Sequence, residues 1–339
     1  MRRVHLVLRV SVALASLAPA GRAQEVLITP QARVEVIGLK RWTVPMIQDS
    51  LARYSPQDSL TSHACAAILR LKLGFPDAAA SYFGRDSSGR ERIVVAIVEP
   101  QDSALVRYRA PAPDSAPDIA EYAAALKVFR SHNHEFQALI QDSTFLVARS
   151  DAPATDARRV LLEPVRQMLV GERTASGHRR AIKVLTQDRN PYNRVMALLV
   201  LSGFPRDDLT WWTLADELRY PNGMAGATAS QILTTLARYT PRTVDWTPAL
   251  DGLQAIMAGT NLFAQVQLLE VLTRTKVAPH LAGPLLQAGA PLLLARLRAS
   301  REAGHDVTRG FLEQVSGKHY GDDPDAWMTW VASARDTPR

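Results

Sequence analysis

The chain has a single cysteine among its 339 residues, Cys65, and this excludes an intrachain disulfide. Its stability must therefore come from apolar burial, which a chain of this length can supply. Cys65 lies at helical spacing from Ile68 and Leu69, so we interpret it as a small core residue rather than a reactive thiol.

The motifs that carry common enzyme chemistry are also missing. The sequence contains no Gly-x-Gly-x-x-Gly, no Gly-x-x-x-x-Gly-Lys and no Gly-x-Ser-x-Gly. His134 and Glu135 begin like the helix of a zinc protease, but position 138 is an alanine where the second histidine would be needed. We therefore predict no catalytic residue, no cofactor and no enzymatic activity.

Spacings typical of metal ligands are absent as well. Four histidines stand singly, without a cysteine or carboxylate at ligand spacing: His178, His280, His305 and His319. Asp322, Asp323 and Asp325 suggest a calcium loop, but the bidentate glutamate and the spacing of such a loop are missing. We predict no metal site. Histidines or acids that meet in space from different segments stay open as an alternative.

Basic runs are short, with no stretch of Lys or Arg longer than two residues. The formal net charge of +7 includes four arginines and no acid within the first 23 residues, so residues 24–339 carry +3. Binding to nucleic acid needs a concentrated basic face. We therefore predict no nucleic-acid partner.

The first 23 residues have the pattern of a secretory signal peptide. Arg2, Arg3 and Arg9 give a positive start, residues 10–20 are apolar, and residues 21–23 read Gly-Arg-Ala. We predict cleavage after Ala23 and a periplasmic or secreted location; an N-terminal anchor or a buried helix is the alternative. No cysteine follows the apolar stretch, which excludes lipid attachment there. No other segment is long and apolar enough to cross a bilayer.

Residues 110–118 carry three prolines and no large apolar side chain, which predicts a semi-rigid linker. It would separate a domain at 24–109 from a second one at 119–331, with a disordered tail at 332–339. On the N-terminal side, residues 33–36 alternate as a strand, two helical segments follow, and residues 78–83 and 93–98 add two strands. This is the order β-α-α-β-β, and residues 104–109 are expected to form one more strand.

Two short motifs flank those helical segments. Residues 34–38 read Val-Glu-Val-Ile-Gly, and residues 73–78 read Leu-Gly-Phe-Pro-Asp-Ala. The pattern resembles the polypeptide-transport-associated (POTRA) domain, in which a strand ending in glycine precedes two helices and a Gly-aromatic-x-x-Ala turn. The resemblance covers about residues 32–100 and implies a domain that binds extended peptides through a sheet edge. An unrelated small α/β domain is the alternative.

On the C-terminal side, apolar helical patterns begin near Asn190, Tyr220 and Asn261, roughly 30 to 40 residues apart. Each interval holds about one further helix, so the pattern predicts stacked helical pairs, an α-solenoid. The pairs resemble HEAT or armadillo-like units. The predicted fold class is α+β, mostly α: a small β-α-α-β-β domain followed by a right-handed α-solenoid of HEAT-like pairs.

Residues 316–330 resemble the closing segment of secreted bacterial HEAT-repeat proteins. Asp323 is placed to cap a helix that begins with Pro324. Trp327 and Trp330 are three residues apart, so they face one side of that helix and would cover the last repeat. These four residues form a predicted end cap.

Trp211 and Trp212 are adjacent, so on a helix their side chains point about 100° apart. One would be buried and the other exposed as an anchor for a partner, which makes both candidate partner-binding residues. The alternative is that both pack between helices.

These patterns together predict a non-enzymatic scaffold for protein–protein interaction in the cell envelope. The partner would bind in the solenoid groove and at the sheet edge. Three alternatives stay open: a carbohydrate- or small-ligand-binding module with an aromatic-lined cleft, a hydrolase whose titratable groups meet in a pocket, and a structural spacer with neither.

Overall fold

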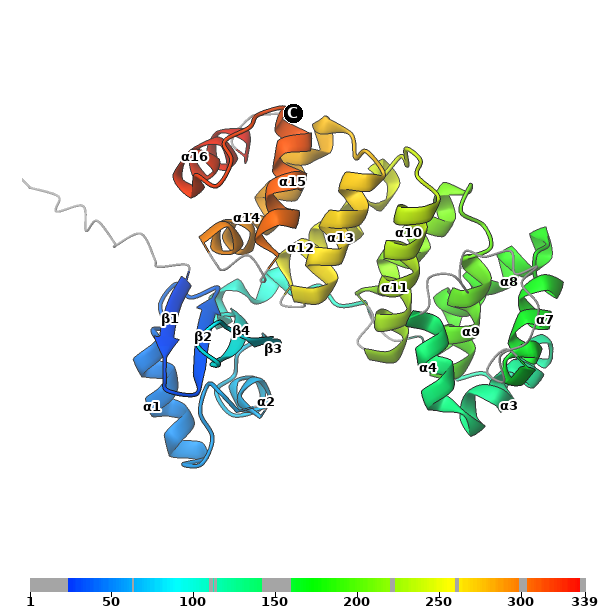
Figure 1. The fold of residues 1–339 in the computed structure, drawn as a ribbon, viewed down its shortest axis with the longest axis horizontal. Helices are drawn as coiled ribbons and strands as arrows, with labels where there is room; N and C mark the ends of the chain where they lie inside the picture. Colours follow the sequence, from blue (N-terminus) through cyan, green and yellow to red (C-terminus); the bar gives the residue numbers. More distant parts are fainter. Residues whose placement is uncertain are drawn as a thin grey trace, which may run out of the picture.

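The computed structural model describes residues 24–62, 64–109, 112, 115–141, 160–219, 223–259, 262–298 and 304–335. The predicted signal peptide, its cleavage site and the last four residues of the predicted tail lie outside this part of the chain. The described residues form a small α/β domain followed by a larger helical region, so the fold is α+β and mostly α (Figure 1).

The α/β domain is built on one mixed sheet with the strand order β1-β2-β4-β3. Its strands are β1 (Gln24–Ile28), β2 (Ala32–Ile37), β3 (Asp77–Arg85) and β4 (Glu91–Val98), and its helices are α1 (Val44–Tyr54) and α2 (Cys65–Leu71). Strands β2 and β4 pair in parallel, whereas β1 with β2 and β3 with β4 pair antiparallel. The order from β2 to β4 is therefore β-α-α-β-β.

The core of this domain lies between the sheet and its two helices. Val34 and Val95 of the central strands share one buried cluster with Ile47 of α1 and with Cys65 of α2. Burial raises the pKa of the Cys65 thiol to about 11, which makes it a packing residue rather than a nucleophile. Gly38 ends β2 with φ +92°, and an added Cβ would lie 2.1 Å from the carbonyl oxygen of Ile97, so only glycine fits.

The sheet differs from the sequence-based expectation at two places. Strand β1 was not expected, because five residues beside a predicted cleavage site give almost no periodicity. The expected strand at 104–109 is absent: residues Pro100–Leu105 form a 3₁₀ helix, η1, and residues 106–109 are irregular. The backbone N–H of Arg109 donates to the carbonyl of Arg219 in the helical region, at 2.9 Å, instead of joining the sheet.

The helical region contains twelve α-helices within the described residues. They are α3 (Ala123–Ser131), α4 (Asn133–Gln141), α7 (Glu163–Gly171), α8 (Ala175–Gln187), α9 (Pro191–Leu201), α10 (Asp208–Glu217), α11 (Gly223–Tyr239), α12 (Leu250–Ala258), α13 (Leu262–Arg274), α14 (Ala282–Arg298), α15 (His305–Ser316) and α16 (Pro324–Arg335). Three short 3₁₀ helices accompany them: η2 (Ala120–Tyr122), η3 (Thr247–Ala249) and η4 (Pro279–Leu281). Helix α16 continues four residues into the predicted tail, to Arg335.

Nine of these helices, α8 to α16, stack in two layers (Figure 1). One layer contains α8, α10, α12, α14 and α16, and the other contains α9, α11, α13 and α15, with each helix packed on the next of its layer. Residues Val195–Leu201 are buried all round α9, because neighbours cover it on every side. A single apolar cluster extends from Tyr122 to Val331, so no pair of helices has a core of its own.

The segment 106–119, which we call the strap, connects the two parts, and its described residues contact the helical region. Its described residues are 106–109, 112 and 115–119. Asp188, in the turn after α8, accepts the N–H of Ala116, and Asn193 of α9 donates to the carbonyl of Pro117 and accepts the N–H of Ile119. The predicted linker is therefore hydrogen-bonded to the helices through Ala116 and Pro117. We call this side, where α8 and α10 end, the strap edge.

A buried ion pair lies at the strap edge. Arg194 of α9 is 1% exposed, and its guanidinium contacts both carboxylate oxygens of Glu217 of α10 at 2.5 Å. Arg194 also donates to the carbonyls of Leu185 and Asp188, at the C-terminus of α8. Arg109 of the strap adds a second guanidinium 3.7 Å from Glu217. The charges of Arg194, Glu217 and Arg109 are therefore paired with one another within the fold.

Candidate functional site

The opposite side of the stack holds a cleft of about 850 Å³. Its lining comes from the turn before α8, the turn between α9 and α10, and the end of α11 with the residues that follow it: Arg173, Ser202, Gly203, Phe204, Pro205, Arg206, Asp207, Asp208, Leu236, Thr240 and Arg242. We call this side, made by residues 172–174, 202–208 and 240–242, the open edge. The cleft is thus assembled from three turns that are far apart in the sequence.

The turn between α9 and α10 is held in place by hydrogen bonds. The carbonyl of Pro205 accepts the indole N–H of Trp211 at 2.9 Å and a guanidinium N–H of Arg242 at 3.2 Å. Asp207 caps α10 by accepting the backbone N–H of Leu209 at 3.0 Å. The wall of the cleft is therefore preorganised by the packing of α10.

Some charged side chains of the cleft form an ion pair, and others do not. Arg242 forms an ion pair with Asp208 at 2.5 Å, and the second oxygen of Asp208 accepts the N–H of Asp245. Arg173 and Arg206 are both exposed and have no ion pair within the described residues. These two guanidinium groups are the available cationic groups of the cleft.

Behind the cleft, three residues have the order of a nucleophile, a base and an acid. The Nε2 atom of His178 lies 2.9 Å from the Oγ1 atom of Thr210, and its Nδ1 atom lies 3.6 Å from a carboxylate oxygen of Asp207. However, Thr210 is 0% exposed, so no substrate can reach its hydroxyl. The ring of Phe204 packs at a tilt against the imidazole, with ring centroids 4.5 Å apart. This arrangement fixes α8 to α10 and offers no accessible nucleophile.

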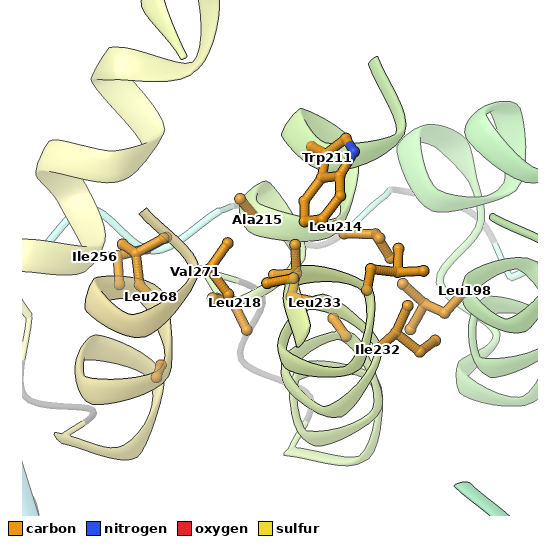
Figure 2. Packing of buried hydrophobic residues seen from close by; sticks show 14 of the residues in the cluster. Leu198, Trp211, Leu214, Ala215, Leu218, Ile232, Leu233, Ile256, Leu268 and Val271 are labelled. Carbon is orange, nitrogen blue, oxygen red and sulfur yellow. The ribbon is translucent and has the colours of Figure 1, made fainter. Parts of the chain in front are cut away.

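The structure places the two predicted partner-binding tryptophans differently. Trp211 is 0% exposed and packs among Leu214, Leu233 and their neighbours between α10 and α11 (Figure 2). It therefore offers no surface to a partner. Trp212 is partly buried against the same cluster, and its indole N–H donates to the carbonyl of Asp245 at 2.7 Å. Trp211 is thus a core residue, whereas part of the Trp212 ring stays accessible to solvent.

The four residues of the predicted end cap come together on the last helix. Asp323 accepts the N–H groups of Asp325 and Ala326 at the start of α16, whose first residue is Pro324. Trp327 is 0% exposed, and Trp330 packs edge-on against it at 6.1 Å between ring centroids. Helix α16 thereby covers α14 at the end of the stack.

One group of potential metal ligands lies beside this cap. His305, Asp306 and Asp322 bring their ligand atoms within 4.8 Å of one another. Arg309 forms ion pairs with both aspartates, so a guanidinium already supplies the positive charge that the two carboxylates require. Sequence spacing could not indicate this group, because Asp322 joins it from a separate turn. The cluster is accounted for as a structural ion pair.

The two outer strands of the sheet differ in how their edges are protected. Strand β3 has an irregular register between Tyr82 and Arg85, and such a bulge discourages further strand pairing. Strand β1 pairs regularly with β2, has no partner on its outer edge among the described strands, and exposes Val26 and Ile28. The edge of β1 is thus the better site for an added strand.

The chain resembles no protein in the three comparisons made: no protein-family model, no curated protein and no solved structure matches it. Within the described residues, no helix has both the length and the apolar character needed to cross a membrane. Function must therefore be inferred from the cleft and the sheet edge. Sequence reasoning missed the cleft, because Arg173, Arg206 and Arg242 share no motif and meet only when their helices stack.

Proposed function

We propose that this protein is a non-enzymatic scaffold of the cell envelope, periplasmic or secreted, that binds a protein partner. In this proposal the α/β domain is POTRA-like, and the helical region is a right-handed α-solenoid of HEAT-like pairs. The strand order from β2 to β4 and the two-layer stacking of α8 to α16 support these assignments. The partner occupies the cleft at the open edge.

The cleft is the observation that carries the proposal. It is built from the turns of successive helix pairs. Turns can present side chains to a partner without disturbing the packing of the core between the helices. Its wall is fixed by the two hydrogen bonds to Pro205, and it keeps Arg173 and Arg206 exposed. A structural spacer would need neither feature.

Two other functions fit the cleft less well. A carbohydrate-binding module would offer aromatic platforms, but Phe204 is the only aromatic residue in the described lining, and it packs against His178. A hydrolase would need an exposed nucleophile beside a base, whereas the Thr210 hydroxyl beside His178 is buried. A second contact through the outer edge of β1 is compatible with the scaffold, since an extended segment could add a strand there.

Site-specific photo-crosslinking in cells that export the full chain tests this proposal. A crosslinking residue replaces Leu209, which is 41% exposed, lies in the first turn of α10 next to the open edge and is outside the cleft lining. The matched control replaces Gln187, an exposed residue at the strap edge. We expect one discrete protein adduct from position 209 and none from position 187.

Two outcomes would contradict the proposal. Adducts of equal yield at both positions would mean unspecific contact along the stack. No adduct at position 209, with efficient crosslinking from a residue in β1 such as Ile28, would place the partner on the sheet and leave the cleft without this role.

A further inference from the structure

We propose that the cleft at the open edge binds a carboxylate-rich segment of the partner, held between the guanidinium groups of Arg173 and Arg206. This inference rests on the proposed scaffold function and adds the chemistry of what is bound. Guanidinium groups bind carboxylates through paired, charge-assisted hydrogen bonds, which is why exposed arginines in a shaped cleft select such groups.

The balance of charges within the cleft leads to this assignment. Arg242 and Asp208 neutralise each other at 2.5 Å. Asp207 is used as the cap of α10 and faces the imidazole of His178. Arg173 and Arg206 are therefore the two cationic groups of the cleft without an ion pair within the described residues, and they outnumber the one carboxylate, that of Asp207, that no arginine pairs.

Helix dipoles do not change this balance. The N-termini of α8 and α10 and the C-termini of α9 and α11 meet at the open edge. Their partial charges have opposite signs and largely cancel, and Thr174 and Asp207 already cap the two N-termini. Which ligand charge the cleft prefers is consequently set by its side chains.

The side chain of Arg173 lies beside the turn between α9 and α10. A Cβ added at Gly203 would lie 3.6 Å from the Cγ atom and 3.7 Å from the Nε atom of Arg173, so the Arg173 side chain lies along this glycine. The volume of about 850 Å³ is near the upper end of the range for ligand pockets, roughly 300–1,000 Å³. A short peptide segment, rather than a single small ion, matches that size.

Peptide carboxylates fit better than the phosphates of a nucleic acid. Asp207 and Asp208 lie in the same cleft and would repel a dense polyanion, whereas spaced carboxylates can avoid them. The net charge of +3 over residues 24–339 also supplies no extended basic face.

Fluorescence anisotropy on the full mature chain provides the first test. The probe is a labelled ten-residue peptide of alternating Glu and Gly, and the comparison probe has Gln in place of Glu. We expect binding of the Glu peptide only, weakened at least tenfold by the double variant Arg173→Gln/Arg206→Gln. The control variant Arg179→Gln/Arg189→Gln removes the same charge from exposed positions outside the cleft and should change the affinity less than twofold.

The outcomes separate this inference from the proposed function. Equal loss of affinity for the Glu peptide in the two double variants would mean that only the net charge matters. Tighter binding of a ten-nucleotide single-stranded DNA than of the Glu peptide would mean that the cleft selects nucleic acid rather than peptide carboxylates. Both results would overturn the inference. If the adduct from position 209 persists unchanged in Arg173→Gln/Arg206→Gln, the scaffold function stands and the role of the two arginines is refuted. Loss of the adduct in that variant, but not in the control, supports both.

Discussion

The two edges of the helical stack use arginine in opposite ways. At the strap edge, Arg194 is buried, bound to Glu217, and hydrogen-bonded to the carbonyls at the end of α8. At the open edge, Arg173 and Arg206 are exposed and contact no acid within the described residues. Arg194 therefore holds the chain together on one side, whereas Arg173 and Arg206 are left without an ion pair among the described residues on the other.

Burial explains the difference. A charge removed from water must be paired and hydrogen-bonded, or it destabilises the fold by several kcal/mol. An exposed guanidinium keeps its hydration and needs no partner, so folding alone gives no reason for its presence in a preorganised cleft. The comparison thus separates arginines that folding explains from arginines that a ligand would explain.

The largest effect is expected for the same substitution made at both edges. Arg194→Met leaves Glu217 buried without its bidentate partner, which should lower the free energy of unfolding by about 3–5 kcal/mol. Arg173→Met should change it by less than about 0.5 kcal/mol, because that side chain is exposed. Urea denaturation followed by circular dichroism measures both.

A double variant provides the control for this pair. Arg194→Met/Glu217→Leu removes both charges, and it should recover much of the lost stability, since an apolar pair of similar volume fits a buried site. If Arg194→Met costs no more than Arg173→Met, the Glu217 carboxylate has another compensating contact and the contrast between the edges fails.

A smaller effect is expected where the strap is attached to the helices. Asn193 is 0% exposed, donates to the Pro117 carbonyl at 3.0 Å and to Asp188 at 2.7 Å, and accepts the N–H of Ile119. Asn193→Ala leaves these groups unsatisfied and should cost about 1–3 kcal/mol. Hydrogen exchange should show faster exchange of the Ile119 amide, while amides in β4 stay protected. Unchanged exchange at Ile119 would mean that the strap is held by its other contacts.

The buried carboxylate of Glu99, in the α/β domain, extends the comparison to the stability of the fold at acidic pH. Glu99 is 0% exposed, and this burial opposes ionisation of its carboxyl. The carboxylate accepts hydrogen bonds from the backbone N–H groups of Lys40, Arg41 and Trp42 and from the side-chain amide of Gln101. These hydrogen bonds outweigh the burial and lower the pKa of the carboxyl. Its stabilisation is present above the unfolded-state pKa of about 4.5 and is lost as pH falls through the folded-state pKa.

Glu99→Gln should remove that part of the acid dependence. The midpoint of urea denaturation should fall less steeply between pH ~6 and ~3 in the variant than in the parent chain. The exposed Glu91, in the same domain, serves as control, and Glu91→Gln should keep the parent slope. Equal slopes in all three proteins would show that other carboxyl groups dominate acid unfolding.

The parts of the fold that could be predicted from sequence depend on local signals. Cap residues and proline mark the starts of α1, α9 and α16, where Thr43, Asn190 and Asp323 accept N–H groups of the first turn. Residues 93–98, β-branched except for Ala96, were expected as a strand, and β4 pairs with neighbours on both sides. Strand β1 was missed because its pairing with β2 is a tertiary contact, and residues 106–109 were misassigned because Arg109 binds the helices.

The site was less predictable than the fold. Trp211 and Trp212 attracted a functional interpretation because tryptophan is a frequent anchor, yet the large apolar area of Trp211 is used to fill the space beneath α10. The cleft depends on residues from three turns, and their convergence follows from helix packing rather than from spacing. Sequence patterns could indicate a stack of helices but not which of its edges would stay open.

The smallest effect is expected for an exposed ion pair of the strap. Arg107 contacts Asp251 of α12 at 2.5 Å, but the two side chains are 38% and 76% exposed. Solvent screening limits such pairs to about 1 kcal/mol or less, so Asp251→Asn should lower the free energy of unfolding by a few tenths of a kcal/mol. This difference should vanish in about 1 M salt, where the Debye length is about 3 Å. Arg194→Met, by contrast, should keep most of its cost at that salt concentration, because salt screens a buried pair much less. A loss for Asp251→Asn as large as that for Arg194→Met would show that attachment of the strap, rather than burial, sets the strength of its charge pairs.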